Sequence, residues 1–306
     1  MAPELSRRRF LAGCGIAGTT ALAAGATAGG VSSTGSTGSA MPPPATNWTQ
    51  TYQTGDDDEA SDLVAAEDDD GYVVAGTTSD GEDSRQAWLF KVGPNGTLVW
   101  ERTFSERAVT VANGIASTGD GYVLAGYTND GSESSQSGFV VRVGLQGNEK
   151  WRNTYDFALG TTDTFEGVDQ DPDGQYVLAG RTSRLESGWI VRLDGSGNQL
   201  LSTDVRDGRA NHFYDVKYHE SRGGYVAIGR TDSPDGPTKG WAMKFDADGS
   251  RQWSESHGRG SGSTADGFNA FYSFVEVDNG FLVAGANAGS SSADERRGWV
   301  FGMNHF

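Results

Sequence analysis

The sequence predicts an all-β fold, a five-bladed β-propeller with four antiparallel strands in each blade, and three observations lead to it. A segment that starts with an aromatic residue and ends in Gly recurs five times in the 306-residue chain, at steps of 50, 54, 49 and 56 residues. A second aromatic segment follows each copy. Asp-Gly and Asn-Gly pairs, which tolerate the positive φ of tight hairpins, stand between neighbouring segments. Repeats of this kind are typical of propeller blades.

Each repeat contains four segments that are short and rich in β-branched and aromatic residues, as strands are. The first strand of the repeat has the weakest pattern and contains Val64, Ile115, Val168, Val216 and Val275. The second begins at Tyr72, Tyr122, Tyr176, Tyr225 and Phe281. The third begins at Trp88, Phe139, Trp189, Trp241 and Trp299, and the fourth carries Trp100, Trp151, Leu201 and Trp253.

The number of fourth strands predicts how the ring closes. Five first, second and third strands are present, but only four fourth strands follow them. Residues 48–52, Trp-Thr-Gln-Thr-Tyr, match residues 100–104, Trp-Glu-Arg-Thr-Phe. We therefore expect residues 47–53 to be the missing strand of the last blade, so that the ring closes without a free sheet edge.

The eight Trp residues occupy equivalent places in these strands and in residues 47–53. Large aromatic residues that recur once per blade are best explained by packing between neighbouring blades. We expect them to be core residues rather than stacking platforms for a sugar.

The chain is strongly acidic, with a formal net charge of −17. Nucleic acids and anionic membranes are recognised by basic patches, so neither is expected as a partner. The charge suits a protein kept soluble in very high salt, and we interpret the chain as halophilic. The single cysteine, Cys14, excludes an intramolecular disulfide and a thiolate zinc cluster, and we expect no metal and no cofactor.

The N-terminal residues resemble a twin-arginine export signal. The segment from Ser6 to Leu11, Ser-Arg-Arg-Arg-Phe-Leu, fits the pattern S-R-R-x-F-L, with Arg7 and Arg8 as the twin arginines. A small-x-small cleavage pattern follows at residues 26–28. The resemblance implies that residues 1–28 are a signal and that the folded protein is exported to the extracellular space or the cell surface. Residues 29–46, rich in Gly, Ser, Thr and Pro, predict a flexible linker, and residues 47–306 the propeller.

The fate of the signal stays open. It is cleaved, retained as an anchor, or lipidated at Cys14, since residues 11–14, Leu-Ala-Gly-Cys, look like a lipobox. Only four residues separate Arg9 from Cys14, which is short for the apolar region of such a signal. The mature chain is expected to have no transmembrane helix.

The whole repeat resembles the secreted propeller-repeat proteins of archaea and bacteria. The resemblance rests on D-G-Y-x-x-A-G-x-T, seen at residues 70–78, followed by W-x-x-K, seen at residues 88–91, and it covers residues 47–306. It implies the propeller fold and an extracellular or surface location, and it implies no particular activity.

Candidate site residues lie on the first strands, which line the central channel of a propeller. Asp62, Asn113, Glu166 and Asp215 occupy roughly equivalent positions there. Inward carboxylates serve as a general acid and base on a glycoside, hold a cation or a water cluster, or simply line a hydrated channel. The connections from second to third and from fourth to first strands are long and variable, and they share one face, where binding sites usually lie.

Two further kinds of motif are present, a calcium-like loop and glycosylation sequons. Residues 169–174, Asp-Gln-Asp-Pro-Asp-Gly, resemble the start of a calcium loop, but the twelfth place is Gly180 rather than Glu, so a turn is the better interpretation. Asn47 and Asn95 stand in N-x-[ST] sequons and are possible glycosylation sites. We find no nucleophile elbow and no zinc-binding histidine motif.

These observations favour an exported, non-catalytic binding or interaction module, monomeric, with an unidentified protein or glycan ligand on the face of the long connections. One alternative is a secreted glycoside hydrolase of the five-bladed type. Another is a purely structural surface protein.

Overall fold

The computed structural model describes residues 48–81, 84–132, 135–220, 222–232, 238–258, 269–277, 280–288 and 296–304. The chain divides into two units, Met1–Gln50 and Thr51–Phe306, and all strands belong to the second. The expected signal peptide, the linker and Asn47 lie outside the described residues. No helix in the described part of the chain is long and apolar enough to span a membrane.

The second unit is all-β, as predicted, and its strands form five antiparallel groups that we call sheets 1 to 5. Sheet 1 contains β1 (Asp57–Ala65), β2 (Tyr72–Ser79), β3 (Arg85–Val92) and β4 (Leu98–Phe104). Sheet 2 contains β5 (Val109–Ser117), β6 (Gly121–Asn129), β7 (Ser137–Gly144) and β8 (Glu149–Tyr155). Sheet 3 contains β9 (Asp163–Gln170), β10 (Tyr176–Thr182), β11 (Ser187–Leu193) and β12 (Gln199–Val205). Sheet 4 contains β13 (Asn211–Tyr218), β14 (Tyr225–Asp232), β15 (Thr238–Phe245) and β16 (Arg251–His257), and sheet 5 contains β17 (Asn269–Val277), β18 (Gly280–Ala288) and β19 (Arg296–Asn304).

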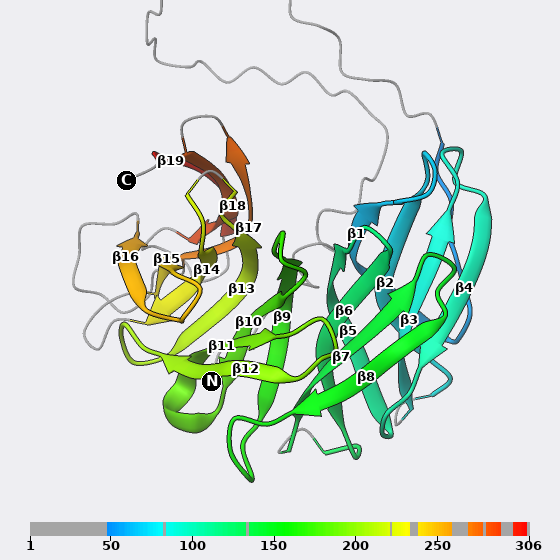
Figure 1. Cartoon of the computed structure of the whole chain (residues 1–306), viewed down its shortest axis with the longest axis horizontal. Coiled ribbons are helices and arrows are strands. Elements are labelled where there is room, and N and C mark those ends of the chain that lie inside the picture. The colour runs from blue at the N-terminus through cyan, green and yellow to red at the C-terminus, as the bar shows by residue number, and fades with distance from the viewer. Residues whose placement is uncertain are drawn as a thin grey trace, which may run out of the picture. The chain divides into compact units, whose positions relative to one another are not determined.

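Strands within each sheet pair in sequence order, and consecutive sheets follow one another in space (Figure 1). Sheets 1 and 2 are also joined by one parallel bridge, between Arg85 and Val109. The strands predicted from the repeats after residue 53 are confirmed, because each of those segments falls inside one of these strands. Residues 48–53 are not in a strand in the described structure, and β19 pairs there with β18. The expected pairing of residues 47–53 with the last sheet therefore stays a prediction.

Antiparallel order places the connections on two opposite faces. The turn face carries the first-to-second and third-to-fourth connections, such as residues 118–120 and 145–148. The loop face carries the others, including residues 183–186, which hold the short 3-10 helix η1 (Arg184–Glu186). The fourth-to-first connections were expected to be long throughout. Residues 105–108 and 206–210 are instead as short as turns, and in each a side chain of the following strand binds the backbone. The Glu106 amide, for example, donates to Thr110 Oγ1 at 3.0 Å.

Every first strand contains a β-bulge at the same place. The bulged residues are Ser61, Asn113, Glu166, Tyr214 and Tyr272. The bulge brings the first strand against the Gly of the second strand. A Cβ atom added at Gly126 would lie 1.9 Å from the Val111 carbonyl oxygen, and one added at Gly180 would lie 1.9 Å from that of Thr164. This contact explains why a Gly recurs at this place in all five second strands.

Neighbouring sheets pack through aromatic residues, as the sequence predicted for most of the Trp residues. Phe213 stacks on Trp241 of its own sheet at 4.4 Å, and its ring fills the space that a Cβ on Gly188 of sheet 3 would need. Phe165 repeats this arrangement with Trp189 and Gly138. Trp48 departs from the expectation, since it is exposed.

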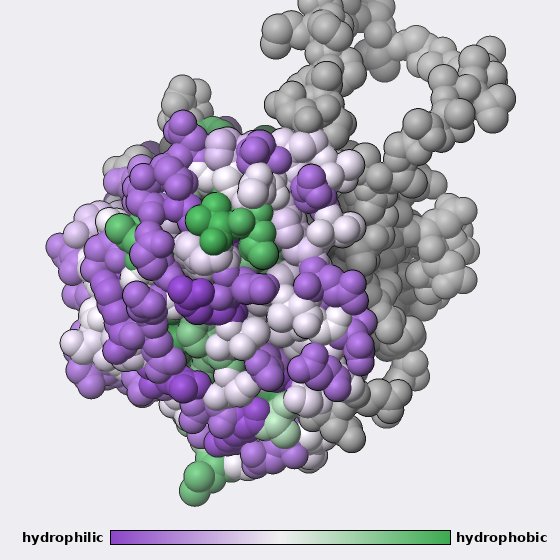
Figure 2. Space-filling view, turned by 90° about the vertical axis from the view of Figure 1, so that its right-hand side faces the viewer, coloured by the Kyte–Doolittle hydropathy of each residue, from purple (hydrophilic) through white to green (hydrophobic). Residues whose placement is uncertain are grey.

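The outer surface agrees with the acidic composition. The side of the molecule that carries β4 is mostly hydrophilic, with apolar residues in a few separate patches (Figure 2).

Candidate functional site

The four sequence-predicted site residues occupy two different positions of the first strand. Asn113 and Glu166 are the bulged residues of β5 and β9. Asp62 and Asp215 stand one place after the bulge in β1 and β13. The expectation of one equivalent ring was therefore wrong in register, because the extra residue of a bulge cannot be seen in the sequence pattern.

Three of these side chains connect one sheet to the first strand of the next. Asp62 Oδ2 accepts a hydrogen bond from the Ile115 amide at 3.2 Å. Asn113 Nδ2 donates to the Phe165 carbonyl oxygen at 2.7 Å. Asp215 Oδ2 accepts from Ser273 Oγ at 3.2 Å. Side chains held in this way act as cross-links between sheets, which weighs against a general acid and base formed by the two aspartates.

Glu166 belongs to a different arrangement, a polar cluster between sheets 3 and 4. Its Oε1 lies 3.5 Å from Nε2 of His212, which is buried near the start of β13. The His212 ring packs on Tyr214 at 4.2 Å, and Tyr214 lies 5.1 Å from Tyr272 of sheet 5. Glu166, His212, Tyr214 and Tyr272 therefore form a continuous set across three sheets.

Two arginines on second strands complete this cluster. Arg230 is the cross-strand partner of His212, and Arg181 is the cross-strand partner of Thr164, whose hydroxyl lies 3.5 Å from Glu166 Oε1. Burial lowers the pKa of His212, and the two arginines lower it further, while Glu166 raises it. His212 is therefore neutral at neutral pH, with one nitrogen able to donate and one to accept hydrogen bonds.

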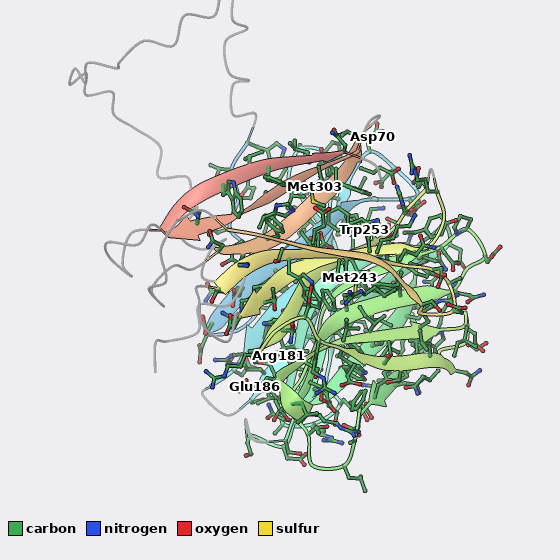
Figure 3. The ribbon with its side chains drawn as sticks, turned by 90° about the vertical axis from the view of Figure 1, so that its left-hand side faces the viewer. Asp70, Arg181, Glu186, Met243, Trp253 and Met303 are labelled. Atoms are coloured by element: carbon green, nitrogen blue, oxygen red, sulfur yellow. The ribbon has the colours of Figure 1, made fainter. Side chains whose placement is uncertain are left out.

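The loop beside Arg181 has unusual backbone geometry. Leu185 and Glu186 of η1 have φ of 55° and 52°, in the left-handed region that non-glycine residues rarely adopt. Figure 3 shows Arg181 and Glu186 together at one end of the molecule, with Asp70 of the turn face at the other end. Backbone strain of this kind clusters at binding sites and indicates that the surrounding contacts hold the loop in place.

We did not predict His212, Arg181 or Arg230 from the sequence. A signal was available, because these residues interrupt the repeat. Where sheets 3 and 4 have Arg181 and Arg230, the other repeats have Thr77, Tyr127 and Ala286. Side chains that differ between otherwise equal repeats are the ones that the scaffold does not require.

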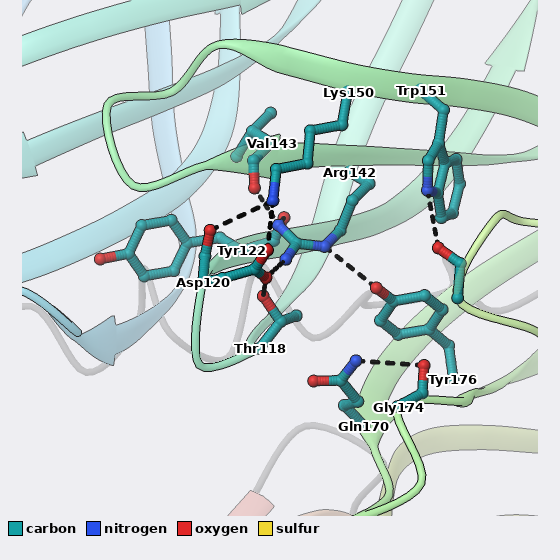
Figure 4. Close-up of polar contacts among 11 residues, drawn as sticks. Thr118, Asp120, Tyr122, Arg142, Val143, Lys150, Trp151, Gln170, Gly174 and Tyr176 are labelled. Carbon is teal, nitrogen blue, oxygen red and sulfur yellow. Dashed lines mark hydrogen bonds and ion pairs between the residues drawn. The ribbon is translucent and has the colours of Figure 1, made fainter.

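A second set of polar residues, on the turn face, was also missed. The third strands of sheets 1 to 4 bury a cation near their ends: Lys91, Arg142, Arg192 and Lys244. Arg142 binds Asp120 of its own sheet, and its Nε donates to the Tyr176 hydroxyl of the next sheet at 3.0 Å (Figure 4). Arg192 Nε donates in the same way to Tyr225 at 3.1 Å. We call this arrangement the cation clasp and interpret it as structural.

The remaining residues singled out in the sequence lie on turns or outside the described residues. Asp171 of the calcium-like motif accepts hydrogen bonds from the amides of Asp173 and Gln175 and from the Tyr225 hydroxyl, as a turn residue does. No group of metal-ligating side chains is found among the described residues. Asn95 lies exposed on a turn, where its Oδ1 accepts from the Thr97 amide at 3.1 Å. Arg7, Arg8 and Asn47 lie outside the described residues.

No protein-family model and no curated protein matches the chain. Among solved structures, an apocarotenoid oxygenase mutant from Synechocystis is 11% identical with a TM-score of 0.48, over 80% of this chain and 59% of that one. An exo-beta-1,3-galactanase from Phanerochaete chrysosporium is 13% identical with a TM-score of 0.47, over 84% and 63%. An alpha-L-arabinofuranosidase from Clostridium thermocellum is 12% identical with a TM-score of 0.44, over 74% and 81%. The chain spans less than two thirds of the length of the oxygenase, and likenesses at this level say nothing about activity.

Proposed function

We propose that this protein is an exported, non-catalytic binding module, a closed five-bladed propeller whose ligand lies on the loop face at the junction of sheets 3 and 4. The observation that carries the proposal is the cluster of Glu166, His212, Arg181 and Arg230. It gathers hydrogen-bond donors and acceptors beside a strained loop, on the face where the variable connections lie. The ligand is a glycan or a protein, and the module works as a monomer.

Closure of the ring by residues 47–53 is supported by the place of Tyr52. Its hydroxyl donates to the Gly96 carbonyl oxygen at 2.6 Å, in a turn of sheet 1. Tyr155, in the fourth strand of sheet 2, makes the same bond to Gly197 of sheet 3 at 2.7 Å. Tyr52 thus contacts sheet 1 as the fourth strand of a preceding blade would.

Export rests on the N-terminal sequence. Arg7 and Arg8 would direct the folded protein through the twin-arginine route to the extracellular space or the cell surface, and the acidic composition suits high salt. Replacing both arginines by Lys is expected to keep the protein in the cytoplasm. Appearance of the Arg7→Lys, Arg8→Lys variant in the medium at the wild-type level would disprove this route.

The binding role is tested by thermal unfolding of residues 29–306 in molar KCl against a panel of soluble polysaccharides and envelope proteins. A ligand present at a hundredfold its Kd stabilises the folded state by about 2.7 kcal/mol, which raises Tm by roughly 5–10 °C. We expect a positive ligand to lose this shift with Glu166→Gln or Arg230→Gln. Glu149→Gln, in an exposed carboxylate on β8, is the control and should keep it.

Two results would count against the proposal. A ligand whose shift survives both cluster substitutions binds elsewhere. Cleavage of a bound polysaccharide that Glu166→Gln abolishes would make the protein a hydrolase instead.

A further inference from the structure

The second and third strands of sheet 5 expose apolar positions that the other sheets bury. Leu282 is 46% exposed, whereas its equivalents Val73, Val123, Val177 and Val226 are at most 1% exposed. Val300 is 68% exposed, whereas Leu89, Val140, Ile190 and Ala242 are at most 1% exposed. In sheets 1 to 4 this face is covered by the next sheet along the chain.

Sheet 1 exposes the complementary positions. Tyr72 is 40% exposed, whereas Tyr122, Tyr176, Tyr225 and Phe281 are at most 3% exposed. Leu63 is 59% exposed, whereas Ile115, Val168, Val216 and Phe274 are at most 5% exposed. In sheets 2 to 5 this face is covered by the preceding sheet.

We propose that these two faces bind each other as a fifth junction of the same chain. One is the face of sheet 5 that exposes Leu282 and Val300, and the other is the face of sheet 1 that exposes Leu63 and Tyr72. We call this junction the seam. The partner is sheet 1 itself, because the same pair of faces already meets four times along this chain, each time with full burial. The inference rests on the closed ring proposed above and adds where the ring is weakest.

The seam differs from the other junctions in its chemistry. The third strands of sheets 1 to 4 carry a buried cation near the turn face, and the equivalent residue of β19 is Gly302. In the closed ring Tyr72 would face Gly302 rather than an arginine, so no cation clasp forms. At the junction of sheets 4 and 5 the buried cation is present as Lys244, although Phe281 stands where the other sheets have a tyrosine. The seam is thus held by apolar contact and one added strand, and it opens before the junctions of sheets 2 and 3 and of sheets 3 and 4, where an arginine binds the tyrosine of the next sheet.

Val300→Asp tests the seam. If the two faces pack together, a carboxylate there is buried among apolar side chains, and Tm falls by roughly 10 °C or more. Leu200→Asp is the control, because Leu200 is 52% exposed on β12 and stays outside any junction. Equal and small changes in both variants would overturn the proposal. Light scattering of the wild type identifies the partner, since a dimer that Val300→Asp dissociates would show that the face binds a second copy instead.

Gly302→Arg tests the missing clasp. A side chain added at Gly302 meets open space in the described structure, and the arginine would reach the Tyr72 hydroxyl as Arg142 reaches Tyr176. We expect amide hydrogen exchange in β1, β2, β18 and β19 of the wild type to be faster than in sheets 2 to 4, and Gly302→Arg to slow it several-fold. Gly302→Ala should leave it unchanged. Uniform exchange across all sheets in the wild type, or no slowing by Gly302→Arg, would overturn the weak seam.

A shortened protein that starts at Thr54 tests the contribution of residues 47–53 separately from that of the two faces. If this shortened protein is less stable than the wild type while Val300→Asp is not, residues 47–53 alone close the ring. If Val300→Asp is less stable and the shortened protein is not, the two faces close it. The binding proposal depends on neither result, because its cluster lies between sheets 3 and 4.

Discussion

Replacing Gly126 by Ala is expected to destabilise the protein strongly, as at the equivalent glycines of the other second strands. The new Cβ would lie 1.9 Å from the Val111 carbonyl oxygen, 2.8 Å from its carbon and 3.1 Å from the Ala112 Cα. Ordinary contact needs more than 3 Å, so β5 must move by over an ångström or lose the bulge at Asn113. Overpacking of this severity costs about 3 kcal/mol, which lowers Tm by roughly 6–12 °C.

The assay is thermal unfolding of residues 29–306 in molar KCl, followed by circular dichroism. Gly144→Ala is the matched control, since a Cβ there meets Lys150 Cε at an ordinary 3.6 Å and the residue lies at the end of a strand. If Gly126→Ala melted within 2 °C of Gly144→Ala, as ordinary surface changes do, the bulge would not be the reason for the recurring glycine.

Three further changes follow from the same contacts. Burial raises the pKa of Tyr155 to about 12, above its ordinary value of about 10, so its contribution to stability is present below pH 10 and is lost as the pH rises through 12. The wild type should therefore lose about 2–3 kcal/mol of unfolding free energy between pH 8 and pH 12, as measured by denaturant titration. Tyr155→Phe should remove this part of the pH dependence. Arg142→Met should cost about 2–3 kcal/mol in denaturant titration, because the Tyr176 hydroxyl and the Tyr122 carbonyl lose a buried charged donor, whereas Arg152→Met on the surface should cost under about 1 kcal/mol. Trp189→Ala should cost about 3–5 kcal/mol by calorimetry, and a loss near zero would show that its stacking on Phe165 is dispensable.

The strands were predictable from the sequence because their signals are local. Alternating aromatic and β-branched residues, with Asp-Gly or Asn-Gly turns, placed Tyr72, Trp88 and Trp100 in the strands where the structure has them. The bulges were not predictable in the same way. An extra residue changes the register by one without changing composition, and this is why Asp62 and Asn113 were assigned to one position although they occupy two.

The candidate site was predicted only through Glu166. His212 was not predicted, since its neighbours Arg181 and Glu166 come from another repeat and the sequence does not show that they meet. The cation clasp was missed because a Lys or Arg in a strand usually reads as an exposed residue. Comparison of the repeats would have separated the two sets: the clasp cations recur, whereas Arg181 and Arg230 do not.

The absence of a charged group at Gly302 changes how dissolved salt acts on this molecule. Ions screen attraction between opposite charges, so the clasps gain nothing from a concentrated medium, whereas salts that are excluded from protein surfaces strengthen apolar contact. The same medium suppresses the mutual repulsion of an acidic chain. If the ring is closed as proposed, dilution would therefore release the seam first and open the ring, while concentrated salt would hold it closed.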